Sequence, residues 1–222
     1  MAFRERLHQA VGEVDAQLDA ANAARETALP GCRRVIRLCG TSIKAVHRLE
    51  PEAALASVDQ AEHVLREVQS AVAAFPAVEH AGFLHDAEKE YVEARCVLAL
   101  VHGSDLPTSD ELRVGGPAYL RGLAEAASEL RRHMLDRLRD GDLARGTELL
   151  QLMDEVYDAL MVVDYPDAVT GGLRRTLDAL RAVLERSRGD LTTTVLQSRL
   201  QQALDAAATR AAGGDGADPG AP

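Results

Sequence analysis

The chain has no tryptophan and few other aromatic residues, which make up 3% of its 222 residues. Alanine and leucine are abundant instead, and both keep their side-chain freedom in a helix, whereas aromatic and β-branched residues lose it. No stretch shows strand-like alternation of useful length, and no repeat of fixed period indicates a solenoid. The composition therefore predicts an all-α protein.

Long apolar runs are also missing, and cysteine is scarce. No segment approaches the length of a membrane span, and the N-terminal stretch MAFRERLHQA has no signal-peptide core. The three cysteines, Cys32, Cys39 and Cys96, form no CxxC pair, which is typical of reduced, buried thiols rather than of a disulfide framework. We therefore expect a soluble, cytoplasmic protein that makes no contact with a membrane.

Several catalytic signatures are absent as well. The chain has no phosphate-binding loop, no GxGxxG motif and no Ser-His-Asp arrangement, so nothing supports nucleotide-triphosphate chemistry or covalent catalysis. A ferritin-like di-iron site needs Glu-x-x-His on two helices of a bundle, and that spacing occurs only at Glu5 and His8. The sequence therefore argues against di-iron chemistry.

Turn residues divide the chain into about seven main helices. Pro30-Gly31, the Gly- and Pro-rich loop 102–117 and the GDLTTT stretch at 189–194 are among the predicted breaks. Short connections between long helices give antiparallel neighbours, so residues 1–208 are predicted to form one helical bundle, with 209–222 a disordered tail. The predicted helices span 3–27, 32–49, 51–74, 78–102, 117–140, 142–163 and 165–188, followed by a short helix that ends near residue 208.

Lysine is nearly absent, and the formal net charge is −10. Lys44 and Lys89 are the only lysines, and all the other strongly basic residues are arginines. The acidic balance argues against a protein that coats duplex DNA by bulk charge, but it leaves a local nucleic-acid site open.

Acidic residues are missing between Thr27 and Leu49, a stretch that carries five arginine or lysine side chains. Four of them fall near one face of the predicted helix. This basic face either pairs with acidic neighbours or contacts phosphates, because arginine forks match phosphate oxygens. With so few aromatic residues to stack on bases, binding would depend on backbone contacts. The basic face consists of Arg33, Arg37, Lys44 and Arg48.

The stretch EKEYVEARC, residues 88–96, belongs to a helix with carboxylates on one flank. Asp86, Glu90 and Glu93 cluster there, beside the apolar stripe of the helix. They form either a solvated border or half of a site for a hard cation, since carboxylate oxygens suit Mg²⁺ or Mn²⁺.

A metal site in a bundle also needs carboxylates from a facing helix. Glu125 and Glu129, in the next long helix, are the candidates. Glu129 borders the apolar stripe of that helix, but Glu125 points nearly opposite to it. Periodicity therefore puts Glu125 in solvent, unless oligomer assembly creates a cavity on that side.

Four motifs, in this order and at this spacing, resemble the translin family, above all translin-associated factor X and its archaeal relatives. FPAVEH, at 75–80, is also similar to the family's break before its glutamate helix. The four motifs are HDAEKEYVEA (85–94), YLRGLAEAASELRRHML (119–135), LMDEVYDALMVVDYPDA (152–168) and RRTLDALRAVLERSRGDLT (174–192).

The resemblance implies a bundle of about seven helices that assembles into a hollow oligomer, commonly an octamer. Family members bind single-stranded RNA and DNA, and the subunits of the factor X type cleave RNA inside the shell with Mg²⁺. Glu90 and Glu93 match two catalytic carboxylates of the family, and Glu129 matches a neighbouring glutamate. Glu125 occupies the position of a third, which is an aspartate in the active subunits. Asp86 would be an outer contact.

Three functions fit these features of the sequence. The first is a metal-dependent endoribonuclease for single-stranded RNA, a homo-oligomer in which Glu90, Glu93 and Glu125 hold Mg²⁺ or Mn²⁺ with support from Glu129. In this hypothesis the basic face attracts the RNA backbone. The second is a non-catalytic protein of the same fold that binds single-stranded RNA or DNA. The third is a helical scaffold that uses its surface for a protein partner.

Overall fold

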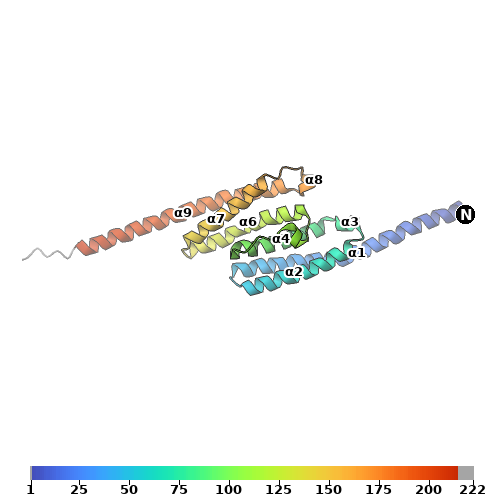
Figure 1. Cartoon of the computed structure of the whole chain (residues 1–222), viewed down its shortest axis with the longest axis horizontal. Coiled ribbons are helices and arrows are strands. Elements are labelled where there is room, and N and C mark those ends of the chain that lie inside the picture. The colour runs from blue at the N-terminus through green and yellow to red at the C-terminus, as the bar shows by residue number, and fades with distance from the viewer. Residues whose placement is uncertain (1, 215–222) are drawn as a thin grey trace, which may run out of the picture.

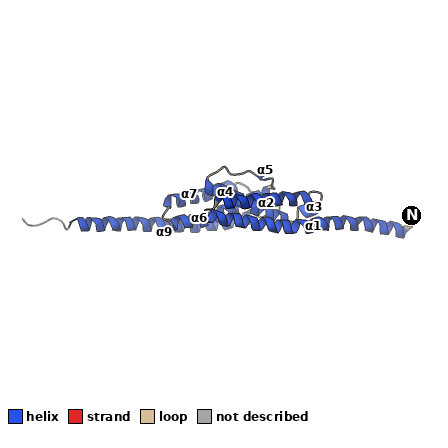
Figure 2. Cartoon of the chain, turned by 90° about the horizontal axis from the view of Figure 1, so that it is seen from below, coloured by secondary structure: helices blue, strands red, loops and turns tan. Residues whose placement is uncertain are grey.

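The computed structural model describes residues 2–214, which form helices joined by turns and loops (Figures 1 and 2). The predicted all-α fold is confirmed. Six helices are long, and α3, α5 and α8 are single turns of four residues. In chain order the helices are α1 (Phe3–His47), α2 (Pro51–Val72), α3 (Pro76–Glu79), α4 (Gly82–His102), α5 (Ser109–Leu112), α6 (Gly116–Arg139), α7 (Leu143–Met161), α8 (Asp167–Thr170) and α9 (Leu173–Gly214).

The body of the protein is a stack of long helices with α4 and α6 in its middle. The helix α1 packs against α2 and α4, α4 packs against α6, and α6 packs against α7 and α9 (Figure 1). Tyr91 of α4 and Met134 of α6 are almost fully buried in the core that results. The two central helices therefore bury more than one face each.

Local signals set most helix boundaries. Pro51 and Pro76 occupy the first turns of α2 and α3, where a missing backbone N–H costs nothing. Gly103 ends α4 with a φ of 67°, in the left-handed region that favours glycine. The Asp142 side chain accepts a hydrogen bond from the backbone N–H of Arg145 and so caps α7.

The predicted break at Pro30-Gly31 is wrong, because α1 continues through both residues. A proline inside a helix removes one hydrogen bond and costs about 3 kcal/mol. Burial of the same face on both sides, at Ala28 and Cys32, offsets that cost. A Cβ at Gly31 would lie 2.4 Å from Cγ2 of Val68, so the glycine lets α1 lie close to α2.

The predicted break in GDLTTT is also wrong, since α9 is one continuous helix there. Leu191 is buried, which holds this turn against the body. The hydroxyls of Thr193 and Thr194 donate hydrogen bonds to the backbone carbonyls of Gly189 and Asp190, one turn earlier. Both threonine side chains thus bond to the helix itself. Packing therefore outweighs the weak helix propensity of this stretch.

Two other predicted helices are each divided near their start. The one predicted from residue 78 is split into α3 and α4. The one predicted from residue 165 is split into α8 and α9 by Gly171 and Gly172, which have φ values of 62° and 89°. Of the predicted tail 209–222, residues up to 214 continue α9, whereas 215–222 lie outside the described residues. The division into a domain over 1–208 and a disordered tail stays a prediction.

Two predictions from composition concern the state of the cysteines and the presence of membrane spans. Cys32, Cys39 and Cys96 are buried and free, as predicted. None of the helices within 2–214 combines the length and the apolar character needed to cross a membrane.

Both long terminal helices extend past the body, in opposite directions (Figures 1 and 2). The projecting part of α1 carries an exposed apolar stripe, and so does that of α9. Such stripes are normally covered in a folded protein. The exposed residues are Phe3, Leu7, Val11, Val14 and Leu18 on α1, and Leu196, Leu200 and Leu204 on α9.

The approach of α6 to α4 is unusually close. Ala118, Gly122 and Ala126, spaced four residues apart, are buried on one face of α6. A Cβ at Gly122 would lie 2.6 Å from the carbonyl oxygen of Lys89 and 2.7 Å from Cβ of Val92. Any side chain at this position would push the two helices apart.

We expect Gly122→Ala to lower the free energy of unfolding by about 1–3 kcal/mol, because the added methyl collides with the backbone of α4. Gly189→Ala is the matched control, since a Cβ at that position in α9 meets nothing within 4 Å. The control should gain about 0.5–1 kcal/mol, as alanine replaces glycine inside a helix. Urea denaturation of both variants measures the difference, and equal effects would contradict the close contact.

Candidate metal centre

Three carboxylates meet between α4 and α6. Glu90 and Glu93 on α4 and Glu125 on α6 each offer one oxygen, and these oxygens all lie within 4.8 Å of one another. All three side chains are partly buried. Three oxygen ligands at this spacing fit the preferences of Mg²⁺ or Mn²⁺, which complete their coordination with water or phosphate oxygens. We call these three residues the acidic cluster.

The expected orientation of Glu125 is wrong. Periodicity placed it in solvent or in a cavity made by assembly, because it lies opposite the apolar stripe of α6. The helix is instead buried on two sides, and its small-residue face lies against α4. Glu125 flanks that face and therefore reaches Glu90 and Glu93 within one chain. The four-residue spacing of Ala118, Gly122 and Ala126 is the signal that could have revealed the second buried face.

A lysine lies inside the acidic cluster, which the sequence did not lead us to expect. Lys89 is only 8% exposed. Its ammonium donates hydrogen bonds to Oε1 of Glu90, at 3.1 Å, and to Oε2 of Glu125. Burial opposes its charge, but the hydrogen bond and charge of Glu125, followed by those of Glu90, raise the pKa of Lys89 above its ordinary value. Lys89 therefore remains an ammonium ion at neutral pH.

Glu93 has the most strongly shifted carboxyl of the acidic cluster. Burial, and then the negative charges of Glu90 and Glu125, raise the pKa of Glu93 to about 8, although Lys89 acts in the opposite direction. Glu93 makes no ion pair within the described part of the chain. A proton on Glu93 thus relieves the repulsion among carboxylates that lie this close together.

Glu129, the fourth predicted ligand, lies beside the acidic cluster rather than in it. Its Oε1 is 2.6 Å from Nε2 of His47, in the last turn of α1, and the His47 side chain is only 3% exposed. The charge of Glu129 still contributes to the raised pKa of Glu93. His47 therefore fixes the orientation of Glu129, a role that sequence spacing did not reveal. Asp86, the predicted outer contact, is exposed and is not among the three clustered carboxylates.

The basic face at the C-terminal half of α1 is exposed. Arg33, Arg37 and Lys44 make no ion pair among residues 2–214, and Arg48 makes only a 3.9 Å contact with Glu50. Around the axis of α1, the first three lie within about 80° of His47, which contacts Glu129. Apart from that weak contact, the positive charges of the basic face are unpaired within residues 2–214.

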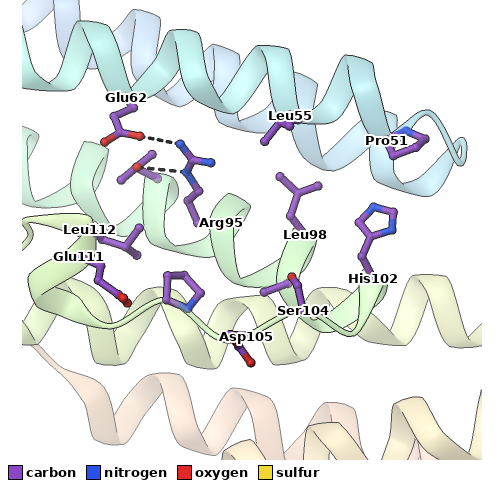
Figure 3. Close-up of a pocket in the computed structure, with 13 residues that line it drawn as sticks. Pro51, Leu55, Glu62, Arg95, Leu98, His102, Ser104, Asp105, Glu111 and Leu112 are labelled. Carbon is purple, nitrogen blue, oxygen red and sulfur yellow. Dashed lines mark hydrogen bonds and ion pairs between the residues drawn. The ribbon is translucent and has the colours of Figure 1, made fainter.

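A separate hollow of about 470 Å³ lies on the other side of α4, between α2, α4 and the loop before α6. Leu55 and Leu98 point into it (Figure 3). At one end, Arg95 donates hydrogen bonds to Glu62 at 2.5 Å and to Asp59 at 2.8 Å. Arg66 also pairs with Glu62, so two arginines offset these two carboxylates. The hollow is therefore a mainly apolar surface that is separate from the acidic cluster.

Known proteins support the fold and the resemblance. No protein-family model matches the chain. An uncharacterized protein of Methanocaldococcus jannaschii is 28% identical over 190 residues, which cover 82% of each protein. The similarity to this relative therefore covers most of the chain.

Solved structures of C3PO share the fold. The AfC3PO–duplex RNA complex is 29% identical with a TM-score of 0.79, over 84% of this chain and 97% of that one. A crystal structure of AfC3PO is 28% identical with a TM-score of 0.76, over 84% and 97%. Apo-NeC3PO, at 17% identity, a TM-score of 0.74 and 83% and 96% coverage, shows the fold alone. The translin-like fold and the resemblance to the translin family are confirmed.

We expect Glu93→Gln to stabilise the metal-free protein at alkaline pH. The folded-state pKa of about 8 exceeds the ordinary 4.5, so this carboxyl's contribution to stability is present below pH 4.5 and is lost as the pH rises to about 8. Glutamine does not ionise, so the variant should gain about 2–4 kcal/mol at pH 9 and less than about 1 kcal/mol at pH 5. Urea denaturation with a chelator at both pH values measures the gain.

The control is Glu155→Gln, which removes an exposed carboxylate from α7. Its effect on stability should be small and independent of pH. A gain for Glu93→Gln that is the same at pH 5 and pH 9 would show that the carboxyl is not protonated in the folded state.

Proposed function

We propose that this C3PO-like protein is a metal-dependent endoribonuclease that acts on single-stranded RNA, with Mg²⁺ or Mn²⁺ held by Glu90, Glu93 and Glu125. The convergence of three carboxylate oxygens within 4.8 Å, between α4 and α6, carries this proposal. The similarity to AfC3PO, which has been crystallised with duplex RNA, supports RNA as the substrate class.

The residues of the proposed site have different roles. A bound divalent cation supplies positive charge at the scissile phosphate and makes a coordinated water more acidic. Glu90 and Glu125 would hold the cation with oxygens from facing helices, and Glu93 would have to lose its proton to serve as a third ligand. His47 holds Glu129 beside the cluster, where the carboxylate would orient water or support a ligand.

The basic face would bind the backbone of the RNA. Arg33, Arg37, Lys44 and Arg48 would contact phosphates in sequence along α1, which ends next to Glu129. Their contacts position the strand but do not read its bases. RNA affinity should therefore fall with salt and depend little on sequence.

Homo-oligomerisation completes the proposal. The stripe from Leu7 through Val11, Val14 and Leu18 follows a heptad spacing over the projecting part of α1. The apolar residues of the projecting part of α9 form a second exposed stripe. We propose that these stripes are covered by further copies of the chain, and that the assembly encloses the acidic cluster in a chamber.

The direct test is cleavage of a labelled single-stranded RNA in Mn²⁺ or Mg²⁺. Glu93→Gln should lower the cleavage rate at least about 100-fold, because it removes a charged ligand. RNA affinity, measured by fluorescence anisotropy at two salt concentrations, should stay within about twofold, since Glu93 is not part of the basic face.

The exposed substitution Glu155→Gln should leave cleavage unchanged. A duplex RNA of the same sequence, run in parallel, tests the preference for single strands. Salt-dependent RNA binding without cleavage in either metal would exclude the nuclease and favour the non-catalytic RNA-binding protein.

The double variant Leu7→Glu, Val14→Glu is expected to reduce the oligomer mass, because two charges would have to be buried in the apolar seam. Light scattering coupled to size-exclusion chromatography measures this mass. The control, Gln9→Glu with Ala16→Glu, adds the same charges on the opposite side of α1 and should keep the assembly. A wild-type protein that is monomeric at micromolar concentration would rule out the assembly.

A further inference from the structure

Lys89 bridges two of the three carboxylates that the proposed metal site requires. Its ammonium contacts Glu90 on its own helix and Glu125 on α6, and it is the most deeply buried lysine or arginine among the described residues. It is therefore the internal cation of the acidic cluster in the metal-free protein.

The ammonium and a divalent cation would compete for the same oxygens. Oε2 of Glu125, which accepts from Lys89, belongs to a carboxylate of the cluster whose oxygens lie within 4.8 Å of one another. Two cations this close repel each other strongly in a partly buried site. A metal ion bound by all three glutamates would thus have to displace the ammonium from at least one of them.

Lysine is suited to such a displacement. Its charge is a compact ammonium on a flexible four-carbon stem, whereas a guanidinium forms rigid, paired contacts with a carboxylate. In a chain whose other exposed and half-buried ion pairs mostly use arginine, this position has lysine. The ammonium can rotate away from the cluster while the backbone of α4 stays in place.

We propose that Lys89 is a resident counter-ion that stabilises the metal-free acidic cluster and leaves Glu125 when a divalent cation binds. This inference rests on the proposed metal site and adds that Lys89 sets its affinity. A lysine that only clamps α4 to α6 would instead remain in place when the metal binds, which makes the two roles distinguishable.

Amine labelling of the full-length wild-type protein tests the movement. The chain has only one other lysine, Lys44, which is exposed and serves as an internal reference. Acetic anhydride should modify Lys89 slowly in the presence of a chelator and at least about fivefold faster in saturating Mn²⁺, as mass spectrometry of the two lysine peptides would reveal. Lys44 should react equally in both. A Lys89 rate that does not change on saturation would overturn the proposal.

Calorimetric titration with Mn²⁺, without RNA, tests the competition. Lys89→Met should bind Mn²⁺ at least about tenfold more tightly than the wild type, because the competing charge is gone. Lys44→Met loses the same charge away from the cluster and should bind like the wild type. An equal or weaker affinity of Lys89→Met would refute the role of Lys89.

The same titration separates this proposal from the one on which it rests. If no variant binds Mn²⁺, including Lys89→Met, the metal site itself is absent. If the wild type binds and both lysine variants match it, the metal site stands and only the counter-ion is excluded. Should Lys89→Met fail to fold without metal, the labelling of the wild type decides alone.

Discussion

The close packing of α4 against α6 is the constraint on which the rest of the site depends. Gly122 has no room for a Cβ against the backbone of Lys89 and the side chain of Val92. This short distance buries a second face of α6 and brings Glu125 beside Glu90 and Glu93. A wider separation would leave the same glutamates on two ordinary solvated flanks. The chemistry proposed for the acidic cluster is therefore a consequence of helix packing.

The same packing makes the site energetically unfavourable when no metal is bound. Burial disfavours the charged form of these carboxylates and they also repel one another, and both effects, burial first, raise the pKa of Glu93. Lys89 offsets part of the repulsion from within the cluster, and His47 restrains Glu129 at its edge. Functional sites commonly keep such local conflicts, which the surrounding core stabilises. Here that support comes from the apolar packing of α4 and α6.

The sequence predicted the helical class, most helix positions and the flank carrying Glu90 and Glu93, because these depend on local periodicity. It failed where packing overrides a local signal. Pro30 and the GDLTTT stretch read as breaks, yet buried neighbours keep α1 and α9 continuous. The orientation of Glu125 was missed because a wheel with one apolar stripe assumes one buried face. The contacts of Lys89 depend on a helix 36 residues away in sequence, which no local pattern encodes.

The distribution of basic residues follows from the difference between their side chains. The arginines of the described residues are exposed or half-buried, where a planar fork can hold a carboxylate or, as along α1, contact a phosphate. Among the described residues, the most deeply buried basic position lies between Glu90 and Glu125, and it has a lysine. A guanidinium there would hold Glu125 through paired hydrogen bonds and fill the space that a metal ion needs. An ammonium balances the charge through fewer, more easily broken contacts. The choice of lysine is thus consistent with a cluster whose negative charge is partly offset when no metal is bound and that stays open to a divalent cation.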